Sequence, residues 1–178
     1  MKTMVKLTLL LICFSCNTKQ SMNSELGREL SIEEKKQIDF TFQCGVEFLG
    51  WIVQLDYDLT GEILITKLKE ATDKIQKEGI EFPLGDYYNY RDVAMSFSIV
   101  FGQAIVDEFH WTWRFVESGD NLGWTIISPD NEYGIALDDY FFSKILWDKE
   151  KQISCMDIYK NLKVNNYKEK NGTLKYLD

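Results

Sequence analysis

His110 is the only histidine of this 178-residue chain, and histidine is the residue type that most often acts as a general base near neutral pH. Nucleophilic hydrolysis requires a serine or cysteine within reach of such a base. The chain has no Gly-x-Ser-x-Gly sequence, which would hold a serine at a sharp strand-to-helix turn. His110 instead follows a long helical pattern, where a histidine bonds the last carbonyls and complements the helix dipole. We favour this structural role over catalysis.

Pairs of acidic residues are a second source of chemistry, because two carboxylates in one site can perform acid–base catalysis or bind a metal ion. The chain contains three such pairs, namely Asp56 with Asp58, Asp107 with Glu108, and Asp138 with Asp139. None has a spacing that is diagnostic of a catalytic site. Adjacent residues on a strand point to opposite faces, so Asp139 is better interpreted as the cap of a helix that begins near Phe141.

The remaining motifs do not support a metal or nucleotide site. There is no CxxC pair and only one histidine, so we expect no zinc site. Asp130, Asn131 and Glu132 lack the calcium-loop pattern, and a hairpin turn explains them. The glycines at 119, 123 and 134 are isolated and form no phosphate-binding loop. We therefore expect neither a metal nor a cofactor.

Two amphipathic helices are predicted at the start of the domain. Ser31 and Glu34 form a capping box, and apolar residues then recur at three- and four-residue spacing to about Gln54. A second apolar face runs from Leu64 to Ile75, in a helix that ends near residue 79. We expect this pair to form a helical hairpin.

A third helix, capped by Asp92, is predicted to be the central helix because its apolar stripe is wide. The stripe comprises Val93, Phe97, Val100, Phe101, Ala104 and Ile105. Gly102 lies within this helix, where glycine costs about 1 kcal/mol relative to alanine. We therefore expect close packing against a neighbouring element at Gly102.

After His110 the hydrophobic period changes from helical to alternating, which predicts three strands. Their apolar faces carry Trp111, Trp113 and Phe115, then Leu122, Trp124 and Ile126, then Tyr133, Ile135 and Leu137. Tight turns join the strands into an antiparallel meander whose tryptophan-rich face lies under the helices. Short C-terminal helices at 141–147 and 156–162, followed by a turn or tail at 164–178, complete an α+β fold.

The aromatic residues before the central helix are the favoured contact surface. Tyr87, Tyr88 and Tyr90 fall in an irregular segment with Pro83 and Gly85. Aromatic residues on loops are enriched at recognition sites. The tryptophans of the strands, by contrast, are explained as core.

The first residues have the composition of a secretory signal peptide. Lys2 and Lys6 are positive, residues 7–14 form an apolar run, and Ser15 is a small residue before Cys16. The apolar run is shorter than the roughly 20 residues that span a bilayer. Export is therefore expected without a permanent membrane helix.

The end of this segment resembles bacterial lipoprotein signals, in which the thiol of an invariant cysteine receives the lipid. Cys13 and Phe14 depart from the usual residues before that cysteine. The resemblance implies acylation of Cys16, with simple cleavage near Ser15 as the alternative. Lys19, and the lack of acidic residues before Glu25, resemble sorting patterns for an outer-membrane anchor that faces the periplasm.

Cys44 and Cys155 are the cysteines that remain in the folded part. An oxidising envelope permits a disulfide between them, but two cysteines are not a disulfide framework. The favoured alternative is that both cysteines are free thiols that behave as small apolar side chains.

The charge of the chain disfavours nucleic acid as a partner. The formal net charge is −8, from 20 basic and 28 acidic residues, and loss of Lys2 and Lys6 changes it to −10. Such a surface repels phosphate backbones and attracts a basic protein. Acidic balance for solubility alone is the simpler alternative.

The segment from the central helix to Lys144 resembles the bacterial family catalogued as domain of unknown function 3806. The resemblance rests on the sequences Phe101-Gly102-Gln103-Ala104, Trp111-Thr112-Trp113-Arg114, residues 122–128, and Phe142-Ser143-Lys144. It covers about a third of the chain, and the proline expected before the last motif is missing. These are packing motifs, so the resemblance implies an immunity or binding role without assigning functional residues.

The sequence thus predicts a signal peptide at 1–16, a polar tether at 17–30, one α+β domain at 31–163 and a tail at 164–178. We expect a lipoprotein of the bacterial cell envelope that is a non-enzymatic binding module, of the inhibitor or immunity type. Its partners are the membrane, through the lipid on Cys16, and a basic envelope protein. The alternatives are a small hydrolase that uses His110 or a carboxylate pair, and a structural lipoprotein.

Overall fold

The computed structural model describes residues 27–55, 59–78, 89–118, 121–137, 154–164 and 175–176. These residues form an α+β fold, in agreement with the sequence prediction. The signal segment, most of the tether, Tyr87, Tyr88 and the predicted helix at 141–147 lie outside the described residues. The pairs Asp56 with Asp58 and Asp138 with Asp139 also lie outside them.

The first helix, α1 (Ile32–Ile52), begins at the predicted cap. The Ser31 hydroxyl accepts a hydrogen bond from the Glu34 N–H at 3.2 Å, and the Ser31 N–H donates to the Glu34 carboxylate at 2.8 Å. This reciprocal arrangement satisfies two N–H groups that the first helical turn leaves without partners. It also fixes the point at which the chain turns from the sheet into the helix.

Helix α2 (Gly61–Glu78) buries the predicted face, including Leu64, Leu68 and Ile75. Helix α3 (Tyr90–Phe109) starts earlier than the sequence analysis placed it. Asn89, not Asp92, is its N-cap, and the side chain of Asn89 accepts hydrogen bonds from two helical N–H groups. Asp92 resembles a cap because it directly precedes the apolar stripe, but it is the N3 residue of the capping box, and its carboxylate accepts a hydrogen bond from the Asn89 N–H.

The sheet has the order β1-β2-β3-β4-β5. Its strands are β1 (Arg28–Glu29), β2 (Thr112–Ser118), β3 (Asn121–Ile127), β4 (Tyr133–Ala136) and β5 (Lys175–Tyr176). The meander β2-β3-β4 is antiparallel as predicted. Strand β1 adds antiparallel to β2, whereas β5 adds parallel to β4.

The two edge strands correct the predicted boundaries of the domain. Arg28 and Glu29 were assigned to the tether, yet they pair with β2, and Leu30 is buried. Residues 175 and 176 were assigned to a tail, yet they pair with β4. Both strands have only two residues, so neither shows the alternation from which strands are predicted.

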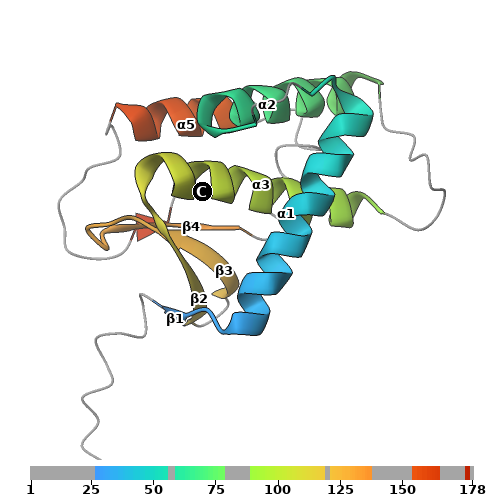
Figure 1. The fold of residues 1–178 in the computed structure, drawn as a ribbon. Helices are drawn as coiled ribbons and strands as arrows, with labels where there is room; N and C mark the ends of the chain where they lie inside the picture. Colours follow the sequence, from blue (N-terminus) through green and yellow to red (C-terminus); the bar gives the residue numbers. More distant parts are fainter. Residues whose placement is uncertain are drawn as a thin grey trace, which may run out of the picture.

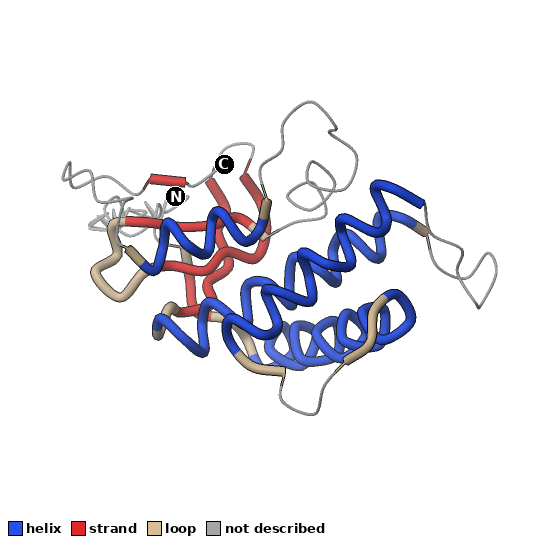
Figure 2. Tube along the Cα trace, turned by 90° about the horizontal axis from the view of Figure 1, so that it is seen from above, coloured by secondary structure: helices blue, strands red, loops and turns tan. Residues whose placement is uncertain are grey.

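The helices lie on one side of the sheet (Figure 1). Helix α3 rests directly on the sheet, α2 and α5 (Cys155–Lys163) form the next layer, and α1 crosses at one end. The view from above shows the helices packed together, with the strands gathered toward one end of the molecule (Figure 2). Helix α5 confirms the predicted helix at 156–162.

Glycine permits the closest approaches to α3. A Cβ at Gly45 of α1 would lie 2.8 Å from the Ser96 carbonyl oxygen, so the two helices meet there at backbone level. A Cβ at Gly102 would lie 2.6 Å from the Trp113 ring and would also meet Leu137. The expectation that Gly102 packs closely against a neighbour is therefore confirmed. No helix among the described residues is long and apolar enough to cross a bilayer.

Candidate binding groove

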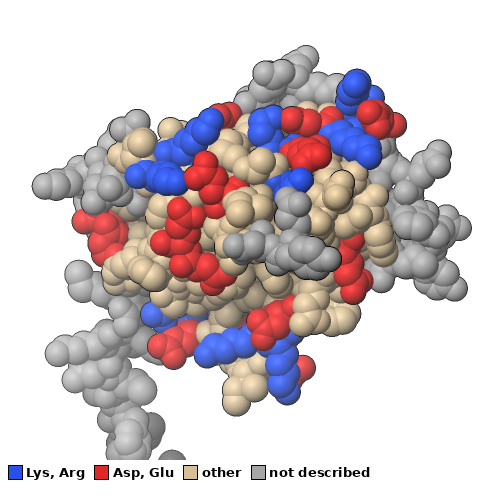
Figure 3. All heavy atoms as spheres, turned by 45° about the horizontal axis from the view of Figure 1, so that its top comes forward, with Lys and Arg blue, Asp and Glu red and all other residues tan. Residues whose placement is uncertain are grey.

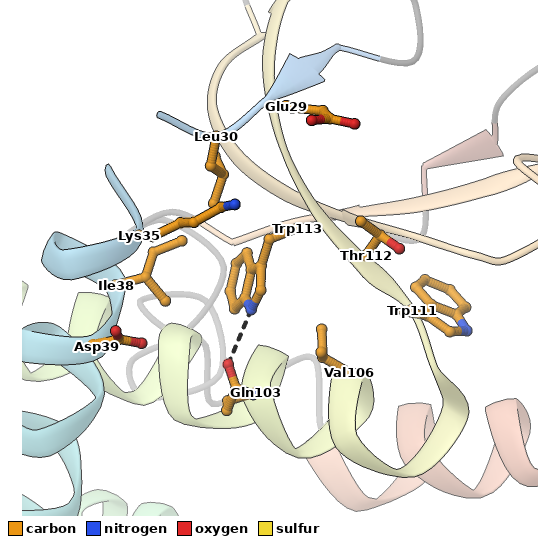
Figure 4. A pocket seen from close by; sticks show the side chains of 10 residues that line it. All are labelled: Glu29, Leu30, Lys35, Ile38, Asp39, Gln103, Val106, Trp111, Thr112 and Trp113. Atoms are coloured by element: carbon orange, nitrogen blue, oxygen red, sulfur yellow. Dashed lines mark hydrogen bonds between the residues drawn. The ribbon is translucent and has the colours of Figure 1, made fainter. Parts of the chain in front are cut away.

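A groove lies where the start of α1, the second half of α3 and the start of β2 meet (Figure 4). Its volume is about 490 Å³, and sites for small ligands usually measure about 300–1,000 Å³. Its lining includes Lys35, Ile38 and Asp39 of α1, Gln103 and Val106 of α3, and Trp113 of β2. Three elements that are distant in sequence therefore build one concave surface.

The floor of the groove is fixed by Trp113. Its indole Nε1–H donates a 3.0 Å hydrogen bond to Oε1 of Gln103, as the dashed line in Figure 4 shows. The Gln103 Nε2 in turn donates to the carboxylate of Asp107 at 2.8 Å. With Gly102 against its ring edge, Trp113 is held both by packing and by a polar bond. The floor is thus a preorganised aromatic surface.

The opposite wall is held by an ion pair between β1 and α1. The two terminal nitrogens of the Arg28 guanidinium, Nη1 and Nη2, each donate a 2.7 Å hydrogen bond to the Glu34 carboxylate. The guanidinium also lies 4.5 Å from the centroid of the Phe115 ring. Hydrogen bonds from Arg28 and then from Ser31 lower the pKa of Glu34 to about 2. Bidentate pairing of this kind adds geometric specificity. It fixes the start of α1 relative to the sheet.

Charged side chains surround the apolar floor. Lys35 and Asp39 lie one helical turn apart on α1, and Glu29 lies at the end of β1. Within the described part of the chain, neither Lys35 nor Asp39 has an ion-pair partner. Among the described residues, the Glu29 carboxylate makes an exposed contact of 3.7 Å with Arg114 and no other ion pair. Two carboxylates and one ammonium group are therefore available to a ligand.

The view that brings the top of Figure 1 forward shows mixed charge (Figure 3). Acidic and basic side chains are interspersed over this face, and several are paired. The charged side chains of the described residues therefore form no single field of one sign on this face. A charged partner would be recognised by local pairs of groups.

His110 is the C-cap of α3 and is exposed. Its backbone is left-handed, with φ 59° and ψ 32°, a conformation that ends helices. The predicted position of His110, between the central helix and the first strand of the meander, is confirmed. No hydrogen bond joins His110 to a serine or cysteine among the described residues.

The one carboxylate pair that the structure describes does not converge. Asp107 is exposed and bonds Gln103, whereas the Glu108 carboxylate accepts a 2.6 Å hydrogen bond from Tyr159. Asp130 lies in the turn between β3 and β4, where its carboxylate accepts from the Glu132 N–H. In the described segments, no three His, Cys, Asp or Glu side chains gather as a metal site would require.

A second polar cluster joins the ends of three helices. Lys163 of α5 bonds Glu62 of α2 at 2.7 Å and lies 3.9 Å from Glu108 of α3. Tyr159 is fully buried, and burial together with the bond to Glu108 raises its pKa to about 12. Such a phenol is a poor base at neutral pH. The cluster is best explained as a clamp that holds α5 against α2 and α3.

The remaining candidate residues are scattered. Tyr90, predicted in a loop with Tyr87 and Tyr88, is the first residue of α3 and is 46% exposed. Cys44 and Cys155 are both free thiols, on α1 and at the start of α5. Burial raises the pKa of both thiols, that of Cys155 to about 12, so both are poor nucleophiles.

The groove has no motif in the sequence that would predict it. Gln103 is the one polar side chain in the stretch from Ile99 to Val106 of α3. This is the local signal that a polar group of the helix meets the strand. Lys35 and Asp39 carry no such signal, because charged residues on an amphipathic helix usually face solvent. Their relation to Trp113 depends on how α1 crosses α3, which no local pattern contains.

Comparison with family models, with curated proteins and with solved structures finds no match to this chain. The resemblance noted from the sequence motifs therefore stays a prediction.

Proposed function

We propose that this chain is a non-enzymatic binding module of the bacterial cell envelope that holds part of a basic partner protein in the groove. The observation that carries the proposal is a fixed tryptophan floor beside Lys35 and Asp39, which have no ion-pair partner within the described residues, and beside the exposed Glu29. Preorganised aromatic residues at the centre of a contact surface commonly supply most of the binding energy. The available carboxylates of Glu29 and Asp39 complement a basic side chain.

Lipidation at Cys16 belongs to this proposal. Ten residues separate Cys16 from Gly27, and an extended chain spans at most about 3.6 Å per residue. The groove would then lie within roughly 40 Å of the membrane surface, beside the point where the tether joins β1. Labelled palmitate should enter the natural protein and not Cys16→Ser. Equal labelling of the two would contradict lipidation.

The partner is tested by affinity capture from envelope extract with the mature chain in detergent. We expect one basic protein to be retained in stoichiometric amount at low salt and released at high salt. Asp39→Lys should abolish retention. Glu33→Lys is the matched control, because it makes the same charge change on the same helix at a residue outside the groove. Equal retention by Asp39→Lys would contradict the groove as the binding site.

His110→Asn separates this proposal from a hydrolase. Asparagine tolerates the left-handed backbone at position 110, so the fold is expected to stay intact. Capture of the partner should be unchanged. Loss of a hydrolytic activity in a correctly folded His110→Asn protein would favour the enzymatic alternative.

A further inference from the structure

Strand β2 is paired unequally along its two edges. On one side, Thr112 and Trp113 pair with Ile127 and Ile126 of β3. On the other side, β1 pairs only with Phe115 and Arg114. Among the described residues, no strand continues β1 alongside Thr112 and Trp113. The start of β2 therefore presents a strand edge.

The helix cap explains why β1 stops. Ser31 is the N-cap of α1, and its reciprocal bonds with Glu34 turn the chain away from the sheet after Leu30. The Arg28–Glu34 ion pair holds that turn. Short, covered or charged edges are the usual ways to protect a sheet from pairing with another chain. Here the turn instead leaves a gap between α1 and β2.

The groove occupies this gap. Thr112, Trp113, Glu29 and Leu30 all line it, so the strand edge and the apolar floor belong to one surface. Figure 4 shows Trp113 directed across the groove toward Gln103, with Lys35 and Asp39 on the α1 side. An extended segment in this place would present successive side chains to opposite faces. One face would meet the tryptophan and the other would meet solvent.

We propose that the groove binds an extended segment of the basic partner, which adds beside β2 at Thr112–Trp113 as a further strand. This inference rests on the proposed function. The backbone of the segment pairs with the strand edge, its apolar side chain rests on Trp113, and a basic side chain meets the Glu29 and Asp39 carboxylates. This is recognition by strand addition, in which main-chain bonds give affinity and alternate side chains give specificity.

The probe is a displayed library of random seven-residue peptides, selected on the mature full-length chain in detergent. Selected peptides should carry at least one lysine or arginine next to an apolar residue. Their affinity should fall at least tenfold with Asp39→Lys and should be unchanged with Glu33→Lys. If no selected peptide is weakened by Asp39→Lys, both this inference and the groove of the proposed function are overturned.

A scan of N-methylated variants of the best peptide then tests strand addition. Each N-methyl group removes one amide donor, and in a strand only alternate amides point toward the neighbouring strand. Only one of Thr112 and Trp113 can direct its N–H and C=O toward the groove, because adjacent strand residues bond to opposite sides. We therefore expect a loss of about tenfold at one amide of the peptide and little change at the amides on either side of it. Weakening by Asp39→Lys without this loss at one amide overturns strand addition but leaves the proposed function standing.

Discussion

The hydroxyl of Tyr159 on α5 donates a 2.6 Å hydrogen bond to Oε2 of Glu108 on α3, across 51 residues of sequence. Glu108 stands one position before the end of α3, and Tyr159 also packs edge-on against Phe109 at 5.6 Å. A buried phenol needs such an acceptor, because an unsatisfied polar group in the core costs free energy. This bond fixes where α5 lies on the rest of the domain.

Tyr159→Phe should lower the free energy of unfolding by about 1–3 kcal/mol, since it removes a bond to a charged acceptor without changing the packed volume. Urea denaturation followed by tryptophan fluorescence measures this loss. Glu108→Gln keeps a neutral acceptor for the phenol and should cost less. A Tyr159→Phe protein as stable as the natural chain would mean that the bond contributes nothing.

The raised pKa of Tyr159 predicts that the fold loses stability at alkaline pH. Burial and the Glu108 carboxylate raise the pKa of Tyr159 from 10 to about 12. The folded state therefore holds this proton more tightly than the unfolded state, so the contribution is complete below about pH 10 and is lost as pH rises toward about 12. The stability difference between the natural chain and Tyr159→Phe should shrink over that window. A constant difference would contradict it.

Local sequence patterns were sufficient for most of the fold. The Ser31–Glu34 box, the apolar face of α2 and the alternation of Trp111, Trp113 and Phe115 each express a periodicity that short segments contain. Strand β1 was missed because a two-residue strand has no period and Arg28 and Glu29 look solvated. Their place in the sheet depends on the bidentate contact with Glu34, which is set by the fold.

The groove could not be predicted from local sequence patterns for the same reason. The alternation of apolar residues predicts Trp113 in the core, and its ring does pack on Gly102. The same side chain also lines the groove, where its indole N–H donates to Gln103. Lys35 and Asp39 lie far from both in sequence. When three separate elements build a site, its residues have no fixed spacing in the sequence. A motif within one loop has such a spacing and can be recognised from it.

Acid should weaken the junction of β1 and α1. Hydrogen bonds from Arg28 and Ser31 lower the pKa of Glu34 from 4.5 to about 2. Because the unfolded state takes up this proton first, the contribution is present above about pH 4.5 and is lost as pH falls toward about 2. Glu34→Gln should reduce the melting temperature at pH 7 and flatten its dependence on pH below about 4.5.

Glu33→Gln is the control for that experiment. It removes one negative charge from the same helical turn, but Glu33 takes no part in the capping box. Its one ion pair within the described residues, with Lys36 at 3.6 Å, is exposed. It should leave the acid dependence close to that of the natural chain. Equal acid profiles for Glu34→Gln and Glu33→Gln would show that the junction does not depend on the Glu34 charge.

Gly102→Ala should destabilise the fold although alanine is the better helix former. The added Cβ would lie 2.6 Å from the Trp113 ring and would also meet Leu137, which is fully buried. Overpacking of a core costs about 1–3 kcal/mol, whereas the gain in helix propensity is about 1 kcal/mol. The difference is a net loss of up to about 2 kcal/mol in urea denaturation. We expect a loss in the upper part of that range, because the bond to Gln103 restrains the ring.

Gly123→Ala is the matched control, since a Cβ at Gly123 of β3 meets no atom within 4 Å. Its stability should stay within about 0.5 kcal/mol of the natural chain. Leu137→Ala makes room beside Gly102, so the cost of Gly102→Ala should be smaller in the Leu137→Ala background. Equal costs of Gly102→Ala in both backgrounds would contradict the clash with Leu137. If Gly102→Ala leaves the stability unchanged, the Trp113 ring moves freely, and the groove does not have the rigid floor on which the proposed function depends.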